Sequence, residues 1–246
     1  PHTLLRLMGR HEAAVIEMGV DNIGQTTRLC EIARPTIGVI TNIGPDHLEF
    51  FGSMEGSAQA KAELLDLLPP DGTAILNADD PYFDYLAARA RCRVVSFGYS
   101  PKADVQALHE KSDGRDGTIF RLLLPGKVRH TIVRIKVQGS HNVTNALAAA
   151  AVGTVLGVSG AVIAQGLSRF RPAAMRSQVV MSHGIRVIND CYNANPASMR
   201  AALEVLGHAQ VKGRGRRIAV LGEMRELGRN SARLHADLAK VAEETG

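Results

Sequence analysis

Short apolar runs alternate with stretches of helical periodicity along this chain, and several of the runs end in a cluster of polar residues. Residues 36–42 and 73–76 are two such runs, and each is followed by a turn that contains Asp and Pro. Continuous apolar runs are typical of parallel strands that are buried on both faces. Ligands of open α/β sheets bind at the carboxyl ends of such strands. The sequence therefore predicts an α/β fold with a polar site along one edge of a mostly parallel sheet.

The alternation changes character once, between residues 103 and 138, where β-rich segments are separated by Asp-Gly and Pro-Gly turns. Such turns are typical of antiparallel strands. Helices are predicted at 25–33, 53–68, 139–156, 160–170, 196–206 and 231–244, strands at 13–17, 36–42, 73–76, 94–98, 178–181, 185–188 and 217–221, and antiparallel segments at 105–109, 118–124 and 131–137. Residues 171–176 have the character of a linker, so we expect one domain in residues 1–174 and another in residues 175–246.

The composition argues against several classes of protein. The chain has 246 residues and a net charge of +5, but its basic residues are dispersed and its aromatic residues are few, which argues against nucleic-acid binding. Its 3 cysteines form no CxxC pair, which argues against a zinc site or a disulfide framework and favours a reducing compartment. No apolar run approaches the ~20 residues of a membrane helix, and no signal peptide is visible. We therefore expect a cytoplasmic protein without a membrane span.

Three polar clusters follow predicted strands and are candidates for one site. Glu17 ends the strand at 13–17, and His47 lies beside Asp46 in the turn after the strand at 36–42. Because the carboxyl ends of parallel strands meet at one edge of a sheet, this carboxylate and this imidazole are candidate metal ligands. The third cluster, residues 190–198, reads Asp-Cys-Tyr-Asn-Ala-Asn-Pro-Ala-Ser, and its proline suits the first turn of a helix.

Each of these features also has a plain structural interpretation. Residues 190–198 could be a polar turn that caps a helix, Glu17 a strand end that faces solvent, and His47 a surface residue. Lys61, in the predicted helix at 53–68, has by itself the pattern of a solvated lysine on an amphipathic helix. The convergence of several polar clusters on one sheet edge favours a ligand site.

A series of longer motifs spans almost the whole chain. They are Thr3-Leu-Leu-Arg-Leu7, Val15-Ile-Glu-Met-Gly19, residues 42–53, Ala60-Lys-Ala-Glu63, Asn77-Ala-Asp79, Gly139-Ser-His-Asn-Val-Thr-Asn-Ala146, residues 190–198, and Gly222-Glu-Met-Arg-Glu-Leu-Gly228 with His235 beyond it. In these motifs the chain resembles the Mur ligases, the ATP-dependent amide-forming enzymes of peptidoglycan precursor synthesis. The Tyr-Asn-Ala-Asn-Pro and Gly-Glu-Met-x-Glu-Leu-Gly signatures are most similar to the branch that adds D-alanyl-D-alanine to UDP-N-acetylmuramoyl-tripeptide.

The resemblance implies a fold and a metal site. Residues 1–174 would form the central ATPase-like domain, a mostly parallel sheet with an antiparallel β section, and residues 175–246 the first part of a Rossmann-like C-terminal domain. Glu17 and His47 would bind Mg²⁺ between the ATP γ-phosphate and the acceptor carboxylate. Lys61 would be carbamylated, which turns an ammonium into an anion that can hold a second Mg²⁺.

The resemblance also implies a nucleotide site built from several motifs. Asn145 would read the adenine, Asp190 would hold the ribose hydroxyls, and Arg176 would reach the phosphates or the ribose from the linker. His141, Asn142 and Asn77 would shape the same site. Asn193 and Asn195 would lie in the interdomain cleft, near the γ-phosphate and the incoming dipeptide.

The reaction of the family suits this set of side chains. A carboxylate attacks the ATP γ-phosphate to give an acyl phosphate, and the amine of D-alanyl-D-alanine then displaces phosphate through a tetrahedral intermediate. The protein contributes positioning and charge neutralisation, for which metals, a lysine and an arginine are suitable. The resemblance thus implies ATP and two Mg²⁺ ions as cofactors and the UDP-tripeptide and D-alanyl-D-alanine as substrates, and we expect a monomer.

The ends of the chain suggest a fragment. It begins at Pro1 without an initiator methionine and ends at Gly246 within a helical pattern, so we expect both ends to be cut from a longer protein. The Gly-x-x-Gly-Lys-Thr phosphate loop and the UDP-sugar domain of the family are not among these residues, and the C-terminal domain stops about halfway. We therefore expect that this polypeptide alone neither binds ATP tightly nor ligates.

Three other interpretations remain open. The chain could come from a different Mur ligase or a folylpolyglutamate synthase, which acceptor specificity would distinguish. It could be a scaffold subunit on the same fold that does not ligate, such as the ligase-like subunit of a lipid II amidotransferase, although the isolated Cys30, Cys92 and Cys191 do not form the zinc cluster expected there. It could also be an unrelated α/β nucleotide-binding module.

Overall fold

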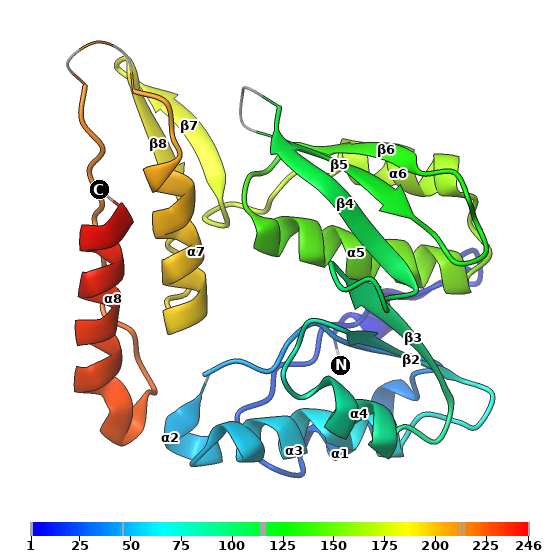
Figure 1. Cartoon of the computed structure of the whole chain (residues 1–246). Coiled ribbons are helices and arrows are strands. Elements are labelled where there is room, and N and C mark those ends of the chain that lie inside the picture. The colour runs from blue at the N-terminus through cyan, green and yellow to red at the C-terminus, as the bar shows by residue number, and fades with distance from the viewer. Residues whose placement is uncertain (1, 46, 114–116, 212, 214, 246) are drawn as a thin grey trace.

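The computed structural model describes residues 2–45, 47–113, 117–211, 213 and 215–245, so Asp46 lies outside the described residues. Its larger part is a six-stranded sheet in which the strands follow one another in sequence order (Figure 1). The strands are β1 (Ile37–Ile40), β2 (Thr73–Asn77), β3 (Arg93–Gly98), β4 (Val105–Ser112), β5 (Thr118–Leu123) and β6 (Thr131–Ile135). Strands β1 to β4 are parallel neighbours, whereas β4, β5 and β6 pair antiparallel. The predicted mostly parallel sheet with an antiparallel section is confirmed.

Helices cover both faces of the parallel strands. Leu76 packs with Ala62 and Leu65 of α3 (Met54–Asp66) and with Leu86 of α4 (Phe83–Arg89), whereas the adjacent Ile75 packs on the opposite face with Leu147 of α5 (Ser140–Val155) and Ile163 of α6 (Gly160–Arg169). All five residues of β2 are buried as a result. This two-sided burial explains why the strand has no polar alternation, since both of its faces must be apolar.

The helix α1 (Gln25–Ala33) is held by a carboxylate from another helix. Its N-cap is Gly24, which has no side chain with which to cap the helix. The buried Glu63 of α3 accepts hydrogen bonds from Gly24 N at 2.6 Å, Thr27 N at 3.0 Å and Thr27 Oγ1 at 2.9 Å. Glu63 therefore satisfies backbone donors that every helix leaves unpaired in its first turn.

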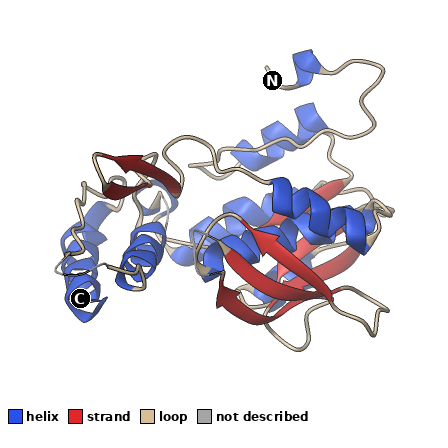
Figure 2. Cartoon of the chain, turned by 90° about the horizontal axis from the view of Figure 1, so that it is seen from above, coloured by secondary structure: helices blue, strands red, loops and turns tan. Residues whose placement is uncertain are grey.

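The C-terminal part, residues 178–245, is smaller. The hairpin of β7 (Gln178–Ser182) and β8 (Ile185–Asn189) is antiparallel, and it is followed by α7 (Pro196–Gly207), the short η2 (Gly228–Asn230) and α8 (Ser231–Thr245). A separate core joins the two long helices through residues such as Leu203, Met224 and Leu238. Figures 1 and 2 both show this part lying beside the six-stranded part, and residues 171–177 connect the two.

Two predicted strands are wrong. Residues 13–17 and 217–221 form no strand, and their central residues are largely exposed, with Val15 at 89% and Val220 at 94%. An apolar run becomes a strand only where a neighbouring strand supplies backbone partners and helices cover its faces. Among the described strands, β1 pairs with β2 alone, and β7 and β8 pair only with each other. Neither run has such a neighbour here, so apolar composition alone was a misleading signal. The predicted helices and the other strands are confirmed to within a few residues.

Candidate functional site

The two parts meet at the beginning of α5, where the loop after β8 and the linker approach each other. Backbone N of Ser177 donates to Asp190 Oδ1 at 2.6 Å, and backbone N of Tyr192 donates to the carbonyl oxygen of Met175 at 3.1 Å. The guanidinium carbon of Arg176 lies 4.0 Å from the centroid of the Tyr192 ring, which is a cation–π contact. The linker and the loop after β8 therefore form one connected structure around Arg176.

The residues on either side of Arg176 have an unusual backbone. Met175 has φ 62° and Ser177 has φ 47°, both in the left-handed region that side chains other than glycine rarely adopt. Such outliers persist only where the surroundings hold them, and here the hydrogen bonds at Met175 O and Ser177 N do so. The strained backbone presents Arg176 on the outside of the linker, against Tyr192.

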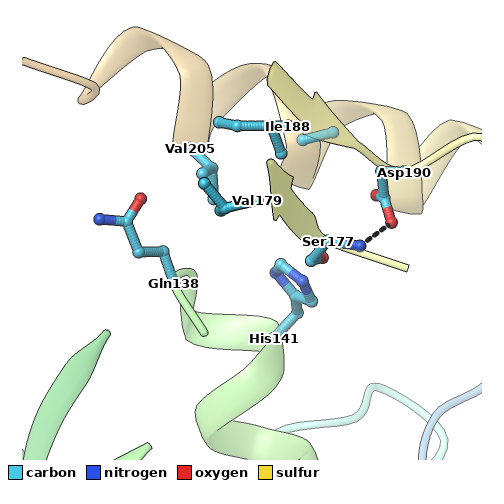
Figure 3. Close-up of a pocket in the computed structure, with 8 residues that line it drawn as sticks. Gln138, His141, Ser177, Val179, Ile188, Asp190 and Val205 are labelled. Carbon is cyan, nitrogen blue, oxygen red and sulfur yellow. Dashed lines mark hydrogen bonds between the residues drawn. The ribbon is translucent and has the colours of Figure 1, made fainter. Parts of the chain in front are cut away.

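His141 lies opposite this structure, at the start of α5 (Figure 3). It lines a gap together with Gln138, Ser177, Val179, Ile188, Asp190, Ala202 and Val205. Burial lowers the pKa of the His141 imidazole, and the carboxylates of Asp190, Glu204 and Glu110 act in the opposite direction. The gap has a volume of about 10 Å³, which is room for about one water molecule. His141 and Asp190 are therefore brought to one place, but the two parts are closed upon each other there.

The asparagines of α5 differ in their surroundings. Asn142 is half-buried, and its Nδ2 donates to the carbonyl oxygen of Gln138 at 2.7 Å and lies 3.0 Å from His141 Nε2. Asn145, one turn further along, is exposed. The Asn142 carboxamide thus holds the start of the helix, whereas the Asn145 residue is open to solvent.

The carboxyl end of β2 fixes the chain that leads to His47. Asn77 Nδ2 donates to the carbonyl oxygen of Thr41 at 3.0 Å, and Asn77 Oδ1 accepts from Asp79 N at 3.0 Å. Asp80, which no sequence motif singled out for a role, accepts from Ile43 N at 2.7 Å. Asn77 and Asp80 are 8% exposed each, and each makes one of its hydrogen bonds to the backbone of residues 41–43. The turn that carries His47 is therefore anchored before it leaves the sheet.

The three residues expected to bind metal are not brought together as a set by any described contact. His47 contacts Glu226 of the C-terminal part through its Nδ1 atom. Lys61 is half-buried on α3 between the buried Ala60 and Ala62, and Glu17 is exposed in the irregular segment before α1. Across the ranges that the structure describes, no three His, Cys, Asp or Glu side chains are grouped as metal ligands.

The two asparagines of the loop after β8 serve the loop itself. Asn195 is the N-cap of α7: its Oδ1 accepts from Ser198 N at 2.7 Å, and its own N donates to Ser198 Oγ at 3.1 Å, which is a capping box. Asn193 is exposed, and its Oδ1 accepts from Ala194 N at 2.9 Å. The structural interpretation of this loop as a helix cap is therefore correct for Asn195.

Comparison with known proteins decides the family. The Mur ligase middle domain matches residues 1–153, and the Mur ligase, glutamate ligase domain matches residues 175–245. The chain belongs to the Mur ligase family. Within this family it is 39% identical, over 98% of its length, to the UDP-N-acetylmuramoyl-tripeptide–D-alanyl-D-alanine ligase of Mycobacterium tuberculosis, and covers 48% of that protein. This Mur ligase chain thus spans about half the length of the curated relatives it matches.

Solved structures agree with this placement. The Mur ligase chain superimposes on MurF of Acinetobacter baumannii with a TM-score of 0.90 at 34% identity, covering 98% of this chain and 51% of that one. It superimposes on MurF of Thermotoga maritima, solved in complex with ADP, with a TM-score of 0.78 at 25% identity, covering 91% of this chain and 50% of the other. Among the described residues of the Mur ligase chain, no helix has the length and apolarity to cross a membrane.

Proposed function

We propose that this chain is part of an ATP-dependent ligase that adds D-alanyl-D-alanine to UDP-N-acetylmuramoyl-tripeptide in the cytoplasm. The observation that carries the proposal is the 39% identity to a ligase of that specificity, which extends over 98% of the chain. The arrangement of Asp190, Arg176 and His141 at the junction supports it, because these are the side chains through which the family would bind the nucleotide. We propose further that residues 1–174 and 175–246 are the domains between which it binds, in a monomeric protein.

Each side chain at the junction has a distinct part in this proposal. The Asp190 carboxylate accepts hydrogen bonds from ribose hydroxyls with the oxygen that Ser177 N does not occupy, and Arg176 offers a planar cation to phosphate oxygens. The exposed Asn145 carboxamide can both donate to and accept from the edge of an adenine. These groups orient the nucleotide; they neither form nor break a bond.

Mg²⁺ fits some of the expected ligands better than others. His47 fits, because the contact of its Nδ1 with Glu226 directs the opposite ring nitrogen, Nε2, away from that carboxylate. Lys61 fits if it is carbamylated, since a half-buried anion is stabilised by a cation beside it. Glu17 does not fit in the observed arrangement, because it is exposed on a segment that pairs with no described strand. When bound, Mg²⁺ would neutralise charge on the phosphates.

The proposal is tested by the protein expressed from its complete gene. Phosphate release is measured with ATP, UDP-N-acetylmuramoyl-tripeptide and each of several amine acceptors. We expect D-alanyl-D-alanine to stimulate release more than any single amino acid does. Greater stimulation by another acceptor would assign the protein to a different branch of the ligases, and no stimulation by any acceptor would favour a scaffold that does not ligate.

A pair of variants connects the activity to the junction. Tyr192→Ala removes the ring against which Arg176 lies, whereas Tyr192→Phe keeps that ring. Cation–π contacts contribute about 0.5–1 kcal/mol at exposed sites, so Tyr192→Ala should raise the KM for ATP about two- to fivefold while Tyr192→Phe leaves it unchanged. An equal KM for both variants would separate Arg176 from nucleotide binding.

A further inference from the structure

A contact outside the nucleotide-binding junction joins the two parts at a second place. The side chain of Glu226 contacts His47 Nδ1, and the carbonyl oxygen of Glu226 accepts from Glu49 N at 3.0 Å. One residue of the C-terminal part thus holds the start of α2 (Leu48–Phe51), whose N-cap is His47, through both its side chain and its backbone. Because these two bonds reach His47 and Glu49, they fix both the distance between Glu226 and α2 and the orientation of Glu226 relative to α2.

The loop that carries Glu226 is built to hold this position. The residues on either side, Met224 and Leu227, are 1% and 2% exposed and belong to the core of the C-terminal part. Glu226 itself has φ 61°, and Gly228 has φ 55°. A Cβ atom at Gly228 would lie 3.3 Å from Glu49 Cα, so a larger residue would push the loop away from α2. A non-glycine residue in the left-handed region is held there by its surroundings, and such positions cluster at functional sites.

We propose that Glu226 is a positioning residue for the metal ligand His47. With the Glu226 carboxylate as acceptor, His47 carries its proton on Nδ1, and the lone pair on Nε2 would be available to hold a divalent cation. Histidines that bind metal commonly donate their second ring nitrogen to a carboxylate in this way, which fixes both the tautomer and the plane of the ring. The ring of Phe51 supports the same orientation from the edge, at 6.2 Å between centroids.

The contact between Glu226 and His47 joins two different parts of the molecule. His47 belongs to the six-stranded part, whereas Glu226 belongs to the C-terminal part. The contact of Glu226 with the His47 ring therefore exists only while the loop 223–228 is docked against α2. This proposal rests on the proposed function, since it assumes that His47 binds a cation, and it makes the cation site depend on how the two parts are placed.

The test measures Mn²⁺ binding to the protein expressed from its complete gene, without nucleotide, by the loss of the electron paramagnetic resonance signal of free Mn²⁺. Glu226→Ala should weaken Mn²⁺ binding about 10- to 100-fold, the usual effect of losing such a partner. Glu226→Gln should retain most of the affinity, because its carboxamide oxygen still accepts from Nδ1. Glu223→Ala is the matched control in the same loop: its side chain is 70% exposed and pairs with Arg225, so the affinity should not change.

A fourth variant separates the two proposals. If His47→Ala binds Mn²⁺ as the wild type does, His47 is not a ligand, and both the metal assignment and the role of Glu226 fail. If His47→Ala weakens binding but Glu226→Ala does not, the metal assignment stands and the role of Glu226 alone is refuted.

A second readout needs no metal. Nitrogen-15 spectra of labelled histidine distinguish the two neutral tautomers of the ring, and we expect the Nδ1–H form for His47 in the wild type and in Glu226→Gln, but not in Glu226→Ala. Hydrogen exchange of residues 47–51 reports docking of the loop separately. A Glu226→Ala protein with faster exchange but an unchanged tautomer would reduce Glu226 to a docking contact and overturn the proposal.

Discussion

Removing the Glu63 carboxylate should lower the free energy of unfolding, and the stability of α1 in particular, more than removing an exposed carboxylate nearby. Glu63 is 7% exposed and is the acceptor for the amides of Gly24 and Thr27 at the start of α1. In Glu63→Ala both amides lose a charged acceptor, and the glycine at the N-cap has no side chain to replace it.

The magnitude follows from the contacts. A hydrogen bond to a charged group contributes about 1.5–3 kcal/mol, and loss of an N-cap acceptor costs about 0.5–2 kcal/mol. Two lost backbone bonds therefore predict a destabilisation of about 3–6 kcal/mol, a large share of the 5–15 kcal/mol typical of a folded protein. Glu63→Gln keeps one acceptor oxygen but turns an NH₂ group toward one of the amides, so about half of that loss is expected.

Urea unfolding followed by circular dichroism gives the total effect, and hydrogen exchange of residues 24–33 shows where it acts. Glu31→Ala is the matched control, because Glu31 lies on α1 itself and makes only an exposed pair with Arg28. Exposed pairs contribute about 0–1 kcal/mol, so the control should stay close to the wild type. A Glu63→Ala protein within about 0.5 kcal/mol of the wild type, with unchanged exchange in α1, would refute this reasoning.

Three further predictions concern other sites. Asn195→Ala should cost about 1 kcal/mol of unfolding free energy because it removes the capping box of α7, whereas Asn193→Ala should cost less than half of that; urea unfolding compares them. Burial and the carboxylate of Glu63 raise the pKa of the Cys30 thiol to about 11. A thiol reagent at pH 8 should therefore modify the exposed Cys191 first and the buried Cys30 only upon unfolding. Early labelling of Cys30 would contradict its burial. Burial lowers the pKa of His141 below 6.5, so as the pH falls the unfolded chain binds this proton before the folded chain does, and the free energy of unfolding should decrease from pH 6.5 through that lowered pKa. His141→Asn should flatten this dependence when unfolding is measured between pH 5 and 8. An equal slope in both proteins would exclude His141 as its source.

The sequence predicted the elements that have local signals. Helix periodicity placed α3 and α5, and the Asp-Gly and Pro-Gly turns placed the antiparallel section, because these signals are local. The failures at residues 13–17 and 217–221 have the opposite cause. A strand depends on neighbours that no local pattern reveals, and Val15 and Val220 are exposed because no described strand lies beside them.

The candidate site was only partly predictable for a similar reason. The motifs pointed to Asp190, Arg176 and His141, which the structure does bring to one junction. They did not reveal Glu226, although it lies within a motif that was recognised, because its partner His47 is 179 residues away. Nor did they reveal Asp80, whose hydrogen bond to Ile43 N spans 37 residues. Contacts of this kind depend on tertiary structure, so residue type and local spacing do not encode them.

Most polar side chains of the loop after β8 that have a described hydrogen bond use it to hold the loop or the linker. Asn195 and Asn193 are used by the loop itself, and one oxygen of Asp190 holds the linker at Ser177. Asp190 also lines a gap of about 10 Å³, whereas pockets for small molecules usually measure about 300–1,000 Å³. A ligand that fills this gap must therefore separate β7 and β8 from the start of α5. The two left-handed residues that flank Arg176 are tied to the loop after β8 by the hydrogen bonds from Ser177 N to Asp190 and from Tyr192 N to Met175 O, so the linker would move together with β7 and β8. Met224 and Leu227, which lie near Glu226, share a core with Leu203 of α7, so such a separation would also alter the contact between Glu226 and His47.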